Sequence, residues 1–172
     1  MAYGTESVPK VYKIFGPGNQ YVTAAKQQVS LRDVAIDMPA GPSEVEVLAD
    51  ETANPVFVAA DLLSQAEHGV DSQAMLITTS EKLMKEVEYE VQRQLALLPR
   101  WEIAEKSLAS SKLILVRDMD EAIALTNEYA PEHLIIETRD YMEQAERIVN
   151  AGSVFLGSLP PELSLIHISE PT

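Results

Sequence analysis

The chain has 172 residues, of which 46% are hydrophobic, and it carries a formal net charge of −14. This length suits one domain, or one domain and part of another, while the negative charge repels phosphate backbones and anionic lipid, which argues against nucleic acid and membrane surfaces as partners. The absence of cysteine excludes disulfides, thiolate zinc sites and cysteine nucleophiles, and no apolar run approaches the roughly 20 residues that span a bilayer. Because the first residues also lack the apolar core of a signal peptide, we expect a soluble, cytoplasmic protein.

Seven apolar runs have the length of β-strands, and most of them are continuous rather than alternating. Continuous runs of Val, Ile and Leu are typical of strands that are covered on both faces, which favours a parallel sheet. Helix-like segments separate many of these runs, so the fold class we expect is α/β, a parallel-type sheet with flanking helices. The expected strands are 11–15, 34–36, 45–48, 75–78, 113–116, 134–136 and 154–156.

The expected helices are 20–30, 55–67, 80–97, 101–109, 119–129 and 140–150. Asn54 can cap the second of these helices with Pro55 in its first turn, and Gly69 can end it. Asp118 lies where negative charge favours the start of a helix. The mixed charges of residues 81–98 indicate a solvated outer face rather than a binding site.

Both ends of the chain interrupt this pattern. The first ten residues contain no helix or strand that would complete a sheet. The last ten, LSLIHISEPT, resemble the translation of a sequencing-library adapter, so residues 163–172 are interpreted as a non-native tail. The alternative is an ordinary apolar C-terminal strand over 163–168, because short apolar runs are ambiguous.

Two loops contain glycine and proline next to polar residues. GPGN, residues 16–19, lies between an expected strand and an expected helix, where backbone and a helix N-terminus can approach an anion. AGPSE, residues 40–44, places Ser43 where a loop meets a strand. Each motif is also a common turn, and by itself neither establishes a binding site.

The segment QAEH, residues 65–68, ends the helix expected over 55–67. Gln65 and His68 are three residues apart, so both side chains can converge on one ion or substrate. Imidazole nitrogen and amide oxygen can both bind zinc. The alternative, which the spacing alone favours, is that His68 only stabilises the helix C-terminus.

The segment APEH, residues 130–133, places a carboxylate and an imidazole side by side before an expected strand. Pro131 ends the helix, and Glu132 and His133 enter the strand on opposite sides. Histidine titrates near neutrality, so His133 could move protons in both directions, and Glu132 could activate a water if burial raised its pKa. The alternative is that Glu and His are adjacent here only by chance. The suspect tail holds the only histidine besides His68 and His133, so neutral-pH proton transfer by histidine must use one of these two.

Taken in order, the segments KIFGPGNQYV, AIDMPAGPSEV, ADETANP, ADLLSQAEHG, YAPEHL and NAGSVFLG closely resemble the histidinol dehydrogenase family, over residues 2–162. Several long motifs in the right order are more specific than any one of them. The resemblance implies oxidation of L-histidinol to L-histidine through the aldehyde, in the last steps of histidine biosynthesis. It also implies two successive NAD molecules, one Zn²⁺ per site, a cytoplasmic homodimer, and incomplete Rossmann-like domains similar to those of aldehyde dehydrogenases.

The resemblance also implies roles for individual residues. Asn19 becomes an NAD contact and Ser43 a substrate contact, while Gln65 and His68 become zinc ligands that also touch the substrate. Glu132 and His133 become the catalytic acid/base pair, and His133 contacts the substrate as well. Residues 1–42 would then be the end of the NAD-contacting domain, and residues 43–162 most of the second Rossmann-like domain.

Departures from the family pattern bear on activity. Similar proteins supply a zinc ligand from an Asp in a Gly-Asp-Tyr segment, where this chain has Ile166, and a further His ligand from the other subunit lies later still. We therefore expect this chain alone to be inactive, and an inactive α/β fragment with weak zinc or nucleotide binding is the main alternative. A zinc hydrolase that uses Glu132 is less favoured, because no set of three protein ligands can be assembled.

Overall fold

The structure is a computed structural model that describes residues 1–16, 20–36 and 43–157. The chain divides into two compact units, Met1–Gly41 and Pro42–Thr172, which are treated separately below. Among the described residues, no helix combines the length and the apolar character needed to cross a membrane. The non-native tail expected over 163–172 lies outside the described residues.

The smaller unit contains the first strand–helix–strand repeat. Strands β1 (Lys13–Ile14) and β2 (Ala35–Ile36) pair in parallel, and helix α1 (Gln20–Ser30) connects them. Lys26 of this helix donates a hydrogen bond to the carbonyl oxygen of Gly16 at 2.9 Å, which ties the helix to the residues that directly follow β1. Both expected strands and the expected helix are confirmed.

The larger unit is built on a five-stranded parallel sheet with the order β5-β4-β3-β6-β7. The chain begins at the central strand, moves outward to one edge, and then returns to the other side of the first strand, which is the order of a Rossmann-like half. This arrangement confirms the expected α/β fold with a parallel sheet. The strands are β3 (Glu44–Ala49), β4 (Gln73–Thr78), β5 (Lys112–Leu115), β6 (His133–Glu137) and β7 (Ser153–Leu156).

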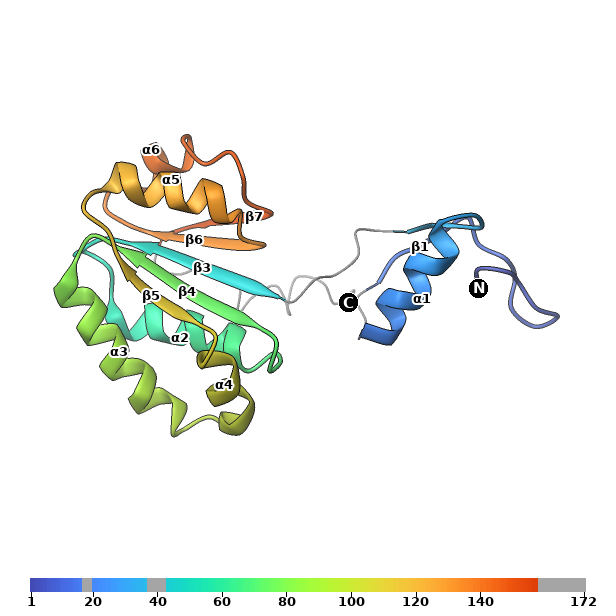
Figure 1. The fold of residues 1–172 in the computed structure, drawn as a ribbon, viewed down its shortest axis with the longest axis horizontal. Helices are drawn as coiled ribbons and strands as arrows, with labels where there is room; N and C mark the ends of the chain where they lie inside the picture. The colour runs from blue at the N-terminus through green and yellow to red at the C-terminus, as the bar shows by residue number, and fades with distance from the viewer. Residues whose placement is uncertain (17–19, 37–42, 158–172) are drawn as a thin grey trace, which may run out of the picture. The chain divides into compact units, whose positions relative to one another are not determined.

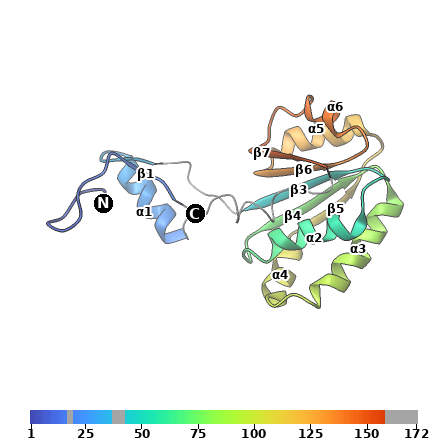
Figure 2. The same ribbon diagram turned by 180° about the vertical axis from the view of Figure 1, so that it is seen from behind.

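Helices cover both faces of this sheet, as Figures 1 and 2 show: α2, α3 and α4 lie on one face, and α5 and α6 on the other. The two faces have separate cores, one around Val47, Leu62 and Leu76, and one around Leu48, Ile77 and Ile136. The alternation of neighbours such as Val47 and Leu48 between these cores explains why the strands read as continuous apolar runs. The helices are α2 (Pro55–Ala66), α3 (Glu81–Leu95), α4 (Trp101–Leu108), α5 (Met119–Tyr129) and α6 (Tyr141–Ala145).

The helix starts follow the expected chemistry. The side chain of Asn54 accepts a hydrogen bond from the Val56 N–H at 2.9 Å, with Pro55 in the first turn of α2. Asp118 caps α5 in the same way by accepting from the Glu121 N–H at 2.8 Å. Helix α3 buries one stripe and turns its charged residues outward, which confirms the solvated outer face.

One expected helix end is shifted by a single residue, and another is wrong. Helix α2 ends at Ala66, one residue before the expected end, with a right-handed C-cap at Glu67, so Gly69 does not end it. Helix α6 ends at Ala145, although a helix was expected as far as residue 150. The side chain of Asn127 explains the second difference, because it accepts hydrogen bonds from the backbone N–H groups of Val149 and Asn150 and so draws this segment out of the helix.

Candidate functional site

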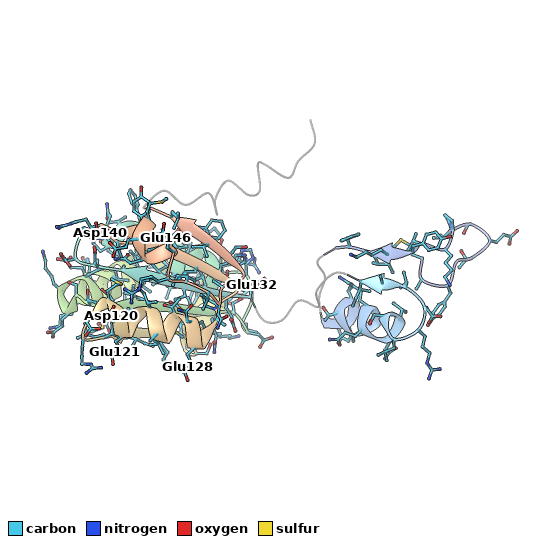
Figure 3. The ribbon with its side chains drawn as sticks, turned by 90° about the horizontal axis from the view of Figure 1, so that it is seen from above. Asp120, Glu121, Glu128, Glu132, Asp140 and Glu146 are labelled. Carbon is cyan, nitrogen blue, oxygen red and sulfur yellow. The ribbon has the colours of Figure 1, made fainter. Side chains whose placement is uncertain are left out.

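The candidate residues of the larger unit gather at the amino ends of its strands. Ser43 directly precedes β3, and His133 is the first residue of β6, paired with Val45 of β3. The β3-α2-β4 crossover returns the chain to this same end, which brings the last turn of α2, with Gln65, and the turn containing His68 there as well. Figure 3 shows Glu132 at the opposite end of this unit from Asp140, which follows β6.

Glu132 and His133 lie close to one another at this edge. The Oε2 atom of Glu132 is 4.0 Å from Nδ1 of His133, and their side chains are 49% and 26% exposed. The same Oε2 atom accepts a hydrogen bond from the Glu44 N–H at 3.3 Å, which fixes the carboxylate against the start of β3. The imidazole packs against Phe155 of β7, with ring centroids 6.0 Å apart. An acid and a base therefore share one partly open edge of the sheet.

Backbone contacts from two sides hold the segment that carries this pair. Helix α5 ends at Ala130, whose φ of 56° and ψ of 60° reverse the chain direction in the left-handed region. On the β7 side, the Gly152 N–H donates to the carbonyl oxygen of Pro131 and the Ser153 N–H to that of Glu132, both at 2.9 Å. A Cβ atom on Gly152 would lie 2.6 Å from the backbone carbonyl oxygen of Glu132, so only glycine permits this close approach.

The end of α2 offers an amide and an imidazole to a ligand. Gln65 is 4% exposed, and its Nε2 atom has no hydrogen-bond partner among the described residues. His68 is exposed in the turn after the helix, and its backbone N–H donates to the Gln65 carbonyl at 3.1 Å. A buried amide without a partner is costly unless something else binds it, and rotation of the amide would present its oxygen to a cation.

Beyond these site residues, the chain matches known proteins over nearly its whole length. A family model described as histidinol dehydrogenase matches residues 1–165. The chain belongs to the histidinol dehydrogenase family. A histidinol dehydrogenase of Bacteroides fragilis is 85% identical over 162 residues, which are 94% of this chain and 38% of the relative. One of Haemophilus influenzae is 57% identical over the same share of each chain. The chain therefore spans less than two-fifths of the length of the curated relatives that it matches.

Solved structures agree with this family and with its fold. The crystal structure of histidinol dehydrogenase from Elizabethkingia anophelis, 55% identical, matches with a TM-score of 0.91 over 93% of this chain and 37% of that chain. The gamma-glutamyl phosphate reductase of Thermotoga maritima, 18% identical, matches with a TM-score of 0.55 over 86% of this chain and 42% of that chain. The second match shows only that the α/β fold is shared.

One residue assigned through the histidinol dehydrogenase resemblance lies outside the described residues, namely Asn19. Ser43 and Glu132 directly precede the neighbouring strands β3 and β6, and the residue after Ser43, Glu44, donates its N–H to the Glu132 carboxylate. The zinc and acid/base roles of these residues stay predictions.

Sequence reasoning missed a buried acid on β3 near this site. Glu46 is fully buried, and one carboxylate oxygen accepts a hydrogen bond from the Thr126 hydroxyl of α5. Burial raises the pKa of Glu46 to about 7, although the Thr126 hydrogen bond opposes this rise. Next to it, burial and the charges of Glu44 and Glu46 raise the pKa of Tyr129 to about 12. The alternation of Glu44 and Glu46 with valines was the only available signal, and it equally suits a solvent-facing strand.

Proposed function

We propose that this chain is the central part of a histidinol dehydrogenase that oxidises L-histidinol to L-histidine through the aldehyde in the last steps of histidine biosynthesis. The observation that carries the proposal is the Glu132–His133 pair, 4.0 Å apart at the amino end of β6, in a chain of this family. One edge thus provides both a proton acceptor and a carboxylate. Oxidation of an alcohol to an acid requires both, because a hydroxyl proton must leave and a water must later attack the aldehyde.

His133 acts on the alcohol in this proposal. Its imidazole lies at the start of β6 and is 26% exposed, so a substrate hydroxyl can reach it. The contact with Phe155 keeps the ring orientation fixed while it accepts the hydroxyl proton. Ser43, whose carbonyl accepts from the Gln73 N–H at 3.1 Å, is held next to the start of β3 and contacts the substrate there.

Glu132 acts at the aldehyde stage. Its carboxylate is held by the Glu44 N–H and is about half exposed, so it can take a proton from an incoming water. The neighbouring His133, which received a proton in the first step, can then return it to solvent before the second oxidation. Separate proton-transfer steps for Glu132 and His133 explain why both groups lie next to each other in the chain.

Zinc is proposed to bind through Gln65 and His68. The orphaned buried amide of Gln65 fits an oxygen ligand, and the exposed imidazole of His68 fits a nitrogen ligand. The described residues contain no group of three or more His, Cys, Asp or Glu side chains that could hold a metal. Further ligands must therefore come from elsewhere, either beyond the described residues or from the partner subunit of a homodimer. When bound, zinc would hold and polarise the amino alcohol, and NAD would accept hydride.

NAD is proposed to contact residues 1–42 through Asn19. The intact protein is proposed to be a cytoplasmic homodimer. An inactive fragment that only binds zinc or nucleotide weakly is the second candidate for this chain by itself, because the metal ligands in the described residues are incomplete.

The proposed function is tested with a chimera. The 162-residue matching segment of this chain replaces its counterpart in the Bacteroides fragilis relative, and NADH formation from L-histidinol, NAD and zinc is followed by absorbance. The expected result is NADH formation by the chimera and none by the chain alone. No NADH from a folded chimera would contradict the dehydrogenase proposal, while activity of the chain alone would show that the metal ligands were wrongly counted.

Zinc binding is tested separately by metal analysis. We expect the chimera to retain zinc through gel filtration, and the Gln65→Ala and His68→Ala variants to lose at least about tenfold in zinc affinity. Ser64→Ala, at a partly buried neighbour on α2, serves as the control for changes at the helix end. Equal zinc content in all variants would contradict the ligand assignment, whatever the activity.

A further inference from the structure

The last turn of α5 is fastened to the central strand by a buried side-chain contact. Thr126 is fully buried, and its hydroxyl donates to the carboxylate of Glu46 on β3. The carbonyl of the same Thr126 accepts from the Ala130 N–H at 2.9 Å, which closes the helix just before Pro131. Helix ends fray unless other groups hold them, so this contact fixes the point from which the Glu132 segment starts.

A second contact fastens the same turn on its other side. The Asn127 amide donates to the Arg147 carbonyl at 3.0 Å, and its oxygen accepts from the N–H groups of Val149 and Asn150 at 2.8 and 3.2 Å. The Asn150 side chain donates back to the Asn127 carbonyl at 3.0 Å. Asn127 therefore organises the whole 147–150 loop against α5.

Both contacts converge on the backbone of the acid/base pair. The loop organised by Asn127 continues directly into Gly152 and Ser153, whose N–H groups bind the carbonyls of Pro131 and Glu132. From the other side, Thr126 fixes the helix end that leads into Pro131 through the left-handed Ala130. An alanine at positive φ is strained, so surrounding contacts must impose this conformation.

We infer that Thr126 and Asn127 are positioning residues for the Glu132–His133 pair: they fix the last turn of α5 to β3 on one side and to the 147–150 loop on the other. Neither residue needs to touch a substrate. The inference rests on the proposed dehydrogenase for its consequence in catalysis, but its structural part stands without it. A shift of the order of 1 Å in a catalytic group can cost up to about a hundredfold in rate.

The catalytic consequence is tested in the chimera with isosteric variants. Thr126→Val removes only the hydroxyl, and we expect kcat to fall about tenfold or more with little change in KM or in zinc content. Thr126→Ser keeps the hydroxyl and should retain most of kcat. Thr138→Val is the matched control, because Thr138 is also buried and its hydroxyl binds the Gln144 side chain, but at the carboxyl end of β6.

Asn127 is tested in the same assay with two variants. Asn127→Leu removes all its side-chain hydrogen bonds, and we expect a fall in kcat at least as large as that of Thr126→Val. Asn127→Asp keeps the oxygen that binds Val149 and Asn150, so it should lose less. If Thr126→Val and Thr138→Val lower kcat equally at equal thermal stability, or if Thr126→Ser is as impaired as Thr126→Val, the positioning role is wrong.

A measurement without catalysis separates this inference from the proposed function. The chain has three histidines, so the imidazole NMR signals are few, and His133→Asn identifies the one from His133. In the chain itself, Thr126→Val and Asn127→Leu should move the His133 signal, whereas Thr138→Val should leave it in place. A His133 signal that is unaffected by all three variants would overturn the inference even if the chimera is active. An inactive chimera with the expected signal shifts would instead overturn only the proposed function.

Discussion

The two ends of the larger sheet differ in what their polar groups do. At the amino end, the side chains of Glu132 and His133 are 49% and 26% exposed, and Gln65 has an amide nitrogen without a partner among the described residues. At the carboxyl end, Asp50 is fully engaged: it accepts from the Thr52 N–H and hydroxyl at 2.8 and 2.5 Å and from the Arg139 N–H at 2.9 Å. The Asp50 carboxylate thus closes turns at the carboxyl end, while the buried Glu137 carboxylate at the same end has no hydrogen-bond partner among the described residues.

The proposed site departs from the usual rule for parallel sheets, in which ligands bind beyond the carboxyl ends of the strands. The hollow at the carboxyl end, lined by residues that include Thr52, Glu137 and Tyr141, measures about 80 Å³. Small-molecule sites commonly measure roughly 300–1,000 Å³, so this hollow is too small for a nucleotide. The proposed function accordingly assigns the chemistry to the amino end of the sheet.

The largest expected effect is the pH dependence of the free energy of unfolding that the buried acids cause. Glu46 has a folded pKa of about 7 against an ordinary 4.5, so the folded state binds the extra proton between these values. Its stabilising contribution is present below about pH 4.5 and is lost as the pH rises through about 7, by about 3 kcal/mol. Glu46→Gln should remove this loss, as measured by urea unfolding across the pH range.

Glu137, at the carboxyl end, provides the contrast to Glu46. Burial, together with the adjacent Asp61 carboxyl, raises the pKa of Glu137 to about 8. The loss of folding stability that accompanies ionisation of Glu137 should therefore extend to higher pH than the loss that Glu46 causes. Glu88→Gln, at an exposed position on α3, controls for the loss of one charge. A difference between the unsubstituted chain and Glu46→Gln that stays constant with pH would contradict burial as the cause.

The next effect concerns the close approach of β7 to the site. Gly152→Ala would place a Cβ atom 2.6 Å from the Glu132 carbonyl oxygen, so we expect a loss of about 1–3 kcal/mol in the free energy of unfolding. Gly69→Ala is the matched control, because its Cβ would meet only the Ser72 side chain at 3.8 Å. Equal stability of the two variants, measured by urea unfolding, would show that the backbone at Glu132 can move freely.

The smallest effect concerns the carboxyl end, where Asn54 caps α2. Asn54→Ala removes the hydrogen bond to the Val56 N–H and should cost about 1 kcal/mol in thermal unfolding. Because α2 carries Gln65 at its other end, the comparison predicts unchanged zinc affinity in the chimera. A loss of zinc comparable to that of His68→Ala would show that the two ends of the sheet are not independent.

The sequence predicted the elements better than the contacts between them. Strand and helix positions follow from apolar periodicity and from caps such as Asn54, which are local. The Glu46–Thr126 contact joins residues 80 positions apart, and no local pattern reports it. The helix expected over 140–150 failed for the same reason, since Asn127 of another helix binds that segment. The site residues came from ordered motifs rather than from spacing, which had favoured a simple helix cap at His68.

The most direct test of the central claim compares two glutamates of the β6 segment in the chimera. Glu132 precedes the strand at its amino end, and Glu137 is its last residue and 3% exposed. With L-histidinol and NAD, Glu132→Gln should lower kcat by about 100-fold to 10,000-fold, while Glu137→Gln should retain at least about half of it. If Glu137→Gln loses as much activity as Glu132→Gln while remaining folded, the assignment of the chemistry to the amino end of the sheet is wrong.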